Sequence, residues 1–112
     1  MTKPNQQLRH ERELCLILSD YGEILFKHHY IDEAAAMFND LLENVPEGDQ
    51  QLTAEAFYRL ANIASAQGNS VKARQQGEES LTIFETIGHG RASEVRQWLD
   101  TLCLATDGNE EC

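Results

Sequence analysis

The side chains that could do chemistry in this chain are its carboxylates, its four histidines and its three cysteines. Acid–base or nucleophilic catalysis needs a carboxylate pair, or a nucleophile with a base, held together in a pocket. Most carboxylates here fall at surface positions of expected helices, as Glu78 and Glu79 do. His28 and His29 are adjacent, so their side chains diverge on a helix and cannot share one face. The pattern therefore predicts that the protein is not an enzyme.

The cysteines do not form a metal-binding pattern. Cys15, Cys103 and Cys112 lack the paired spacing that zinc ligands need. Cys15 and Cys103 fall among apolar residues, which favours core positions. The sequence has no secretory signal, so we expect reduced thiols in a cytoplasmic protein. We predict no metal and no cofactor.

The net charge of the chain limits the classes of partner that it is expected to bind. Nineteen acidic residues against nine Lys and Arg give a net charge of −10. A nucleic-acid ligand needs a basic surface, and an anionic membrane repels an acidic one, so neither partner is expected. No run of about 18 apolar residues predicts a membrane span. The acidic surface has two possible roles: it keeps the protein solvated, or it attracts a basic partner. The sequence leaves both open.

The elements that must position these side chains are helices. No segment alternates Val, Ile and Thr as a strand would. Apolar spacing and breakers predict five helices, at residues 5–28, 32–44, 52–67, 70–87 and 92–104. Ser70 is expected to cap the fourth helix. The acidic tail, residues 105–112, has no apolar periodicity and is expected to be disordered.

Two apolar stripes predict which helix faces are buried. The first helix is expected to bury one face, made of Leu14, Ile17, Leu18, Tyr21 and Leu25. Its first turns, as far as Glu13, are mostly polar and are expected to fray or project. The last helix is expected to form a closing layer through Val95, Trp98, Leu99 and Leu102. Trp98 should pack on the fourth helix, against Leu81 or Phe84.

The helices repeat at an offset of 39 residues, which superposes Ala34 on Ala73 and Gly22 on Ala61. Small residues at these positions let the two helices of a hairpin approach closely. Gly77 departs from the pattern, since glycine within a helix costs about 1 kcal/mol relative to alanine. It marks either a close contact with the last helix or a weak point, and the sequence does not decide.

The pattern resembles the tetratricopeptide repeat, a 34-residue helix-turn-helix unit. The clearer copy has Phe57 at the large aromatic position, Leu60 and Ala61 at the Leu-Gly pair, and Gly68 at the turn. In the first copy, His29 replaces the turn glycine, so that turn is expected to differ. The resemblance implies an all-α fold of antiparallel helical hairpins. Its parts are an extension of the first helix (1–14), two repeats (15–48 and 54–87), a capping helix (91–104) and the tail (105–112).

The resemblance also implies a protein-interaction module, an adaptor or regulator that holds a peptide or helix of a partner in a concave groove. Motif positions place these residues on the groove: Ser19, Asp20, Glu23, Phe26, Lys27, Tyr58, Arg59, Asn62, Ser65, Arg96 and Asp100. Asn62 has both a donor and an acceptor for a bound main chain. Chaperone-binding members grip a terminal carboxylate with Lys and Asn, where this chain has Ser19 and Glu23, which disfavours that ligand.

Two further readings stay open. Small acidic proteins also suit a role as a chaperone or immunity-type inhibitor of a basic secreted effector or toxin. A stack of two repeats is short, because about three are usually needed for stability, so leftover apolar surface could also drive a homodimer.

Overall fold

Five helices and no strand make up the part of the chain that the computed structural model describes, which is the backbone of residues 4–105 and the side chains of residues 12–102. The helices are α1 (Pro4–Lys27), α2 (Ile31–Asn44), α3 (Gln50–Ala66), α4 (Ser70–Thr86) and α5 (Arg91–Ala105). The predicted all-α fold of helical hairpins with a C-terminal helix is confirmed. The tail that was predicted to be disordered spans residues 105–112, and its residues 106–112 lie outside the described part of the chain.

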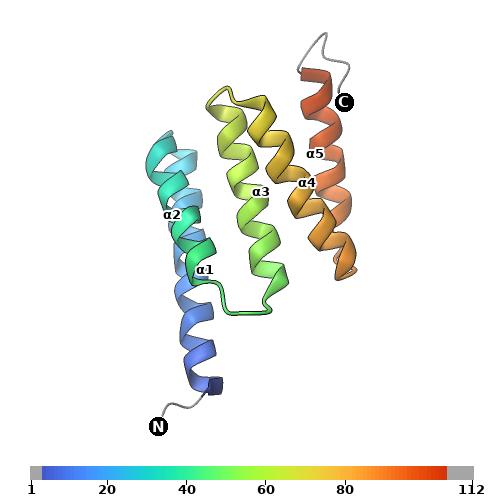
Figure 1. Cartoon of the computed structure of the whole chain (residues 1–112). Coiled ribbons are helices and arrows are strands. Elements are labelled where there is room, and N and C mark those ends of the chain that lie inside the picture. The colour runs from blue at the N-terminus through green and yellow to red at the C-terminus, as the bar shows by residue number, and fades with distance from the viewer. Residues whose placement is uncertain (1–3, 106–112) are drawn as a thin grey trace.

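The helices stack in chain order (Figure 1). α1 pairs with α2 and α3 pairs with α4 as antiparallel hairpins, while α2 packs on α3 and α5 packs on α4. The loop between α2 and α3 connects the two hairpins at the lower edge of the stack in Figure 1. This arrangement puts α1 at one end of the stack and α5 at the other.

The three tight turns share one geometry. His29, Gly68 and Gly88 each take a left-handed φ, of 70°, 82° and 68°. In each turn the next N–H bonds to the carbonyl five residues back, as in Tyr30 N to Leu25 O at 2.8 Å. The expectation that the first turn would differ is therefore wrong, because His29 adopts the conformation that glycine takes in the other two turns.

Polar side chains cap two of the helices. The Asn69 carboxamide oxygen accepts a hydrogen bond from Lys72 N at 3.1 Å, so Asn69 is the N-cap of α4. The sequence-based expectation of Ser70 is wrong by one residue, since Ser70 is the first residue of α4. Asp49 caps α3 in the same way by accepting from Leu52 N at 3.2 Å. Asp49 also pairs with Arg12 of α1, which ties the inter-hairpin loop to the first helix.

Two glycines permit close helix contacts. A Cβ at Gly22 would lie 2.7 Å from Phe38 Cε2, so the α2 ring sits directly on the α1 backbone. A Cβ at Gly77 would lie 2.8 Å from both Trp98 and Leu99. Of the two roles considered for Gly77, a close contact with the last helix or a weak point, the structure shows the close contact.

The core lies between successive helices. One cluster joins the first hairpin to α3 through Phe38, Leu41 and Leu60. A second cluster joins α3, α4 and α5 around Phe84 and Val95. Trp98 packs against this second cluster together with Leu81, and its ring meets Tyr58 edge-on at a centroid distance of 5.8 Å.

The predicted buried face of α1 is partly wrong. Leu14, Ile17 and Tyr21 are 43%, 64% and 53% exposed. The side of α1 that faces α2 instead carries Cys15, which is fully buried, and Gly22. Apolar residues occupy more than half of the circumference of α1, so spacing alone fits more than one face. The Phe38 ring selects the face with glycine, because only that face lets it approach the backbone.

Candidate partner-binding groove

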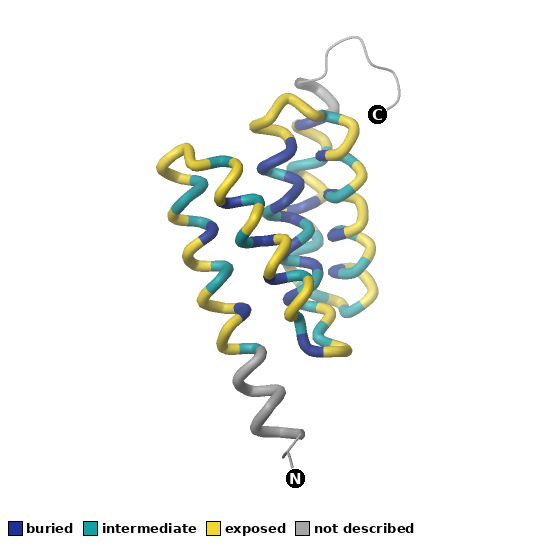
Figure 2. Tube along the Cα trace, turned by 60° about the vertical axis from the view of Figure 1, so that its left-hand side comes forward, coloured by how far each residue is buried: buried dark blue, intermediate teal, exposed yellow. Residues whose placement is uncertain are grey.

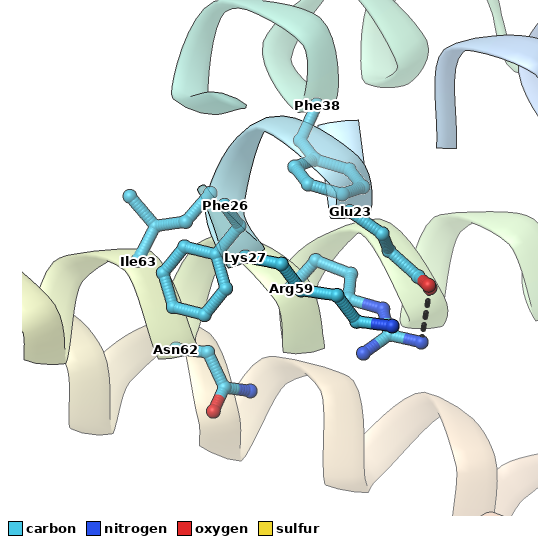
Figure 3. A pocket seen from close by; sticks show the side chains of 7 residues that line it. All are labelled: Glu23, Phe26, Lys27, Phe38, Arg59, Asn62 and Ile63. Carbon is cyan, nitrogen blue, oxygen red and sulfur yellow. Dashed lines mark ion pairs between the residues drawn. The ribbon is translucent and has the colours of Figure 1, made fainter. Parts of the chain in front are cut away.

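A hollow that opens to solvent lies between α1 and α3. Its volume is about 400 Å³, counted with the space at its open mouth. Its lining residues come from α1, α2 and α3 and are Glu23, Phe26, Lys27, Phe38, Arg59, Asn62 and Ile63 (Figure 3). Five of these are predicted groove residues. The repeat register brings them together, since α1 and α3 are the first helices of the two hairpins.

The floor of the hollow is apolar and fixed. Phe38 and Ile63 are 1% and 2% exposed and belong to the first core cluster. Phe26 is partly buried against the same cluster, and its ring faces Asn62 (Figure 3). Rings and branched side chains held by a packed core lose little further freedom when a ligand arrives. The floor can therefore accept an apolar side chain at low entropic cost.

The rim of the hollow is polar. Arg59 of α3 forms an ion pair with Glu23 of α1, and each side chain is 32% exposed. Lys27 is exposed, and no carboxylate among the described residues lies within ion-pair distance of it. The lining therefore holds two cations and one carboxylate, in a chain whose net charge is −10. Asn62 Nδ2 donates to Tyr58 O at 2.9 Å, which fixes the carboxamide on α3.

The other six predicted groove residues do not line this hollow. Tyr58 is 6% exposed and faces α5, where its hydroxyl donates to Glu94 at 3.3 Å. Burial, followed by the charge of Glu94, raises the pKa of Tyr58 above its ordinary value of 10.0. Arg96 forms an ion pair with Glu85 of α4. The remaining residues are half-buried or exposed elsewhere on α1, α3 and α5, and they are Ser19, Asp20, Ser65 and Asp100.

Two lining residues were not predicted as part of the groove. Phe38 lies on the buried face of α2, and Ile63 follows Asn62 on the buried side of α3. Both are core residues that also form the floor of the hollow. The sequence carries a signal only for Ile63, which directly follows the groove residue Asn62, because the place of Phe38 beneath the hollow depends on a contact between α1 and α2.

Within residues 12–102, the side chains include no group of three or more His, Cys, Asp or Glu residues that could hold a metal ion. Among the helices described, none combines the length and the apolar character that crossing a membrane requires.

Comparison with known families gives one match. A tetratricopeptide repeat model matches residues 13–86, which span both hairpins from α1 to the end of α4. No curated protein and no solved structure matches the chain. Tetratricopeptide repeats generally mediate protein–protein interactions.

Proposed function

Because this chain belongs to the tetratricopeptide repeat family, we propose that it is an adaptor or regulator that binds a peptide or helix of a partner protein in the groove between α1 and α3. The observation that carries the proposal is the hollow itself, which combines an apolar floor with a polar rim. This combination is typical of sites that take one anchoring side chain and orient the rest of the ligand by hydrogen bonds.

The lining suggests the chemistry of the bound segment. An apolar side chain would fill the space above Phe38 and Ile63, and Asn62 would hydrogen-bond the ligand main chain. Lys27 would contact a carbonyl or carboxylate next to the anchor. A terminal carboxylate alone is disfavoured, because Glu23 places a negative charge in the same hollow and uses Arg59 as its partner.

A second candidate function is a chaperone or immunity-type inhibitor of a basic effector or toxin. The observation that favours it is the net charge of −10, which would speed association with a basic partner. Binding of that kind would depend strongly on salt and weakly on the floor of the hollow. The salt dependence of the measured affinity therefore separates the two functions.

The groove can be tested with peptides selected from a random displayed library on the wild-type protein. The double variant Arg59→Ala, Asn62→Ala removes two hydrogen-bonding side chains from the rim and leaves the floor intact. We expect it to weaken binding of the selected peptides by about 10-fold or more, because it removes the Asn62 hydrogen bond to the ligand and leaves the Glu23 carboxylate unpaired in the hollow. Isothermal titration calorimetry would measure the change.

The matched control is Asn39→Ala, Arg74→Ala, which changes the same two residue types on α2 and α4, outside the hollow. We expect this control to bind the peptides with wild-type affinity. Equal affinity for the groove variant and the wild type would reject the groove, and selective loss in the control would move the site to the second helices of the hairpins.

A further inference from the structure

One face of α1 exposes a row of large apolar side chains, which we call the α1 stripe. It consists of Leu14, Ile17, Tyr21 and Ile24, which are 43%, 64%, 53% and 53% exposed. Their spacings of three, four and three residues are those of a helix seam that packs against another helix. In Figure 2, the helix nearest the N-terminus alternates exposed and buried segments along its length. α1 therefore has two apolar faces, and its own fold covers one of them.

The internal repeat shows what such a face does when it is covered. Advancing three stripe residues by the repeat offset of 39 leads to Ala56, Leu60 and Ile63 of α3, which are 1%, 4% and 2% exposed. On α3 these residues belong to the core cluster shared with the first hairpin, where α2 packs on α3. The α1 stripe is the same face one repeat earlier, where no preceding hairpin covers it among the described residues. It is thus a face shaped to receive a helix.

We propose that the α1 stripe packs against the α1 stripe of a second copy of this chain, with the two helices antiparallel about a two-fold axis. The stripe and the side chains that flank it would bury on the order of 600 Å² per copy, so the dimer reaches the lower end of the range of about 1,200–2,000 Å² found in specific interfaces. A dimer of this size is expected to be reversible, with dissociation in the micromolar range.

The charges beside the stripe favour the antiparallel direction. Glu13, Asp20 and Lys27 lie at equivalent heptad positions along one edge of the stripe. When Leu14 packs on Ile24 of the partner subunit, Glu13 falls beside Lys27 of the partner subunit. Asp20 then falls beside Asp20 of the partner subunit on the two-fold axis. The axis creates the attractive pair twice and the repulsive contact once, so attraction outnumbers repulsion. A parallel dimer would instead set Glu13 against Leu18 of the partner subunit and Asp20 against Leu25 of the partner subunit. It would place Lys27 beyond the end of the partner helix, which leaves the three charges unpaired.

The dimer face is separate from the groove on α1. Glu23 and Phe26 of the hollow lie on the other side of the helix from Ile17 and Tyr21, as the 100° rotation per residue requires. Only Lys27 borders both surfaces. Dimerisation and partner binding can therefore be tested independently, and the failure of either one leaves the other unaffected.

Light scattering over protein concentrations from about 1 to 500 µM tests the dimer, a range chosen to bracket micromolar dissociation. We expect the wild-type mass to rise from that of one chain to that of two. Ile17→Asp should weaken the dimer about 100-fold, since it places two carboxylates in the seam. Circular dichroism would show an unchanged fold, because Ile17 is 64% exposed.

The matched control is Val71→Asp, which adds the same charge at a side chain that is 58% exposed on α4. We expect Val71→Asp to dimerise like the wild type. A wild-type mass that stays at one chain, or an Ile17→Asp variant that dimerises normally, overturns the proposal. A mass that rises beyond two chains also overturns it, because a two-fold contact closes after one pairing.

Charge reversal tests the antiparallel direction. Glu13→Lys alone and Lys27→Glu alone each turn both predicted pairs repulsive, so each variant should dimerise about 10-fold more weakly than the wild type. Mixing the two variants makes both pairs attractive again, so a heterodimer should form with near wild-type affinity. Failure of the mixture to dimerise better than either variant alone overturns the antiparallel arrangement.

Discussion

The two ends of the helical stack differ in the faces they leave outward. α5 buries Val95 and packs Trp98 inward, while its exposed residues between positions 91 and 102 are polar, such as Arg96, Gln97 and Asp100. α1 leaves Ile17 and Tyr21 outward and more than half exposed. A terminal helix with a polar outer face ends a repeat stack, whereas an apolar outer face continues it. The described face of α5 is therefore suited to end a stack, and the α1 stripe is suited to receive a partner helix.

Replacing one aromatic residue at each end should lower the unfolding free energy by very different amounts. Trp98→Ala removes the side chain that packs on the second core cluster and meets Tyr58 edge-on, so we expect a loss of about 3 kcal/mol of unfolding free energy. Tyr21→Ala should change the unfolding free energy by no more than about 0.5 kcal/mol, since the ring is 53% exposed. Urea denaturation at a protein concentration below the dimer dissociation constant measures both. Similar losses for the two variants would show that the ends are equivalent.

A methyl group at each close helix contact should sharpen the comparison. A Cβ at Gly22 meets the buried Phe38 ring at 2.7 Å, while a Cβ at Gly77 meets the end of the Leu99 side chain and Trp98 at 2.8 Å. We expect Gly22→Ala to cost about 2 kcal/mol and Gly77→Ala about 1 kcal/mol, because Phe38 is 1% exposed and enclosed by the core, whereas Trp98 and Leu99 are only partly buried and can shift toward solvent.

Thermal and urea unfolding would rank these variants. Gly90→Ala is the control, since nothing lies within 4 Å of a Cβ there. A larger cost at Gly77 than at Gly22 would mean that α5 is held more rigidly than the first hairpin.

The smallest effect concerns the hydrogen bond between Tyr58 and Glu94. Tyr58→Phe should cost about 0.5–1 kcal/mol at neutral pH. In the wild type, burial and then Glu94 raise the pKa of folded Tyr58, so the unfolded chain loses this proton first as the pH rises. Unfolding free energy should therefore fall as the pH rises above 10.0 toward the folded pKa.

Tyr58→Phe should remove this part of the fall, as measured by urea denaturation across the alkaline range. Tyr30→Phe is the matched control for removing a phenol hydroxyl, since Tyr30 is 56% exposed. An equal alkaline loss in Tyr58→Phe and the wild type would mean that the phenol is not buried against α5.

Much of the fold could be predicted because its determinants are local. Pro46 and Gly68 mark the ends of helices, and the match of Ala34 to Ala73 reveals the repeat. The outward face of α1 could not be predicted by spacing, since apolar residues lie on both of its candidate faces. The choice depends on the contact between Gly22 and Phe38, which joins residues on different helices.

The candidate site was predictable where the repeat register determines it. Glu23 and Lys27 on α1 and Asn62 on α3 occupy motif positions, and the structure brings them around one hollow. Tyr58 and Arg96 were expected in the groove, but their orientation depends on how α5 packs against the second hairpin. The internal repeat does not extend to α5, so its register does not predict how α5 packs or how Tyr58 and Arg96 are oriented.

The most direct test of the difference between the two ends is an amide ¹⁵N–¹H correlation spectrum recorded over a dilution series. We expect concentration-dependent shifts at the α1 stripe, from Leu14 to Ile24, and constant positions for Arg96, Gln97 and Asp100 on the outer face of α5. Shifts centred on α5, or spectra that do not change with concentration at either end, would contradict the account.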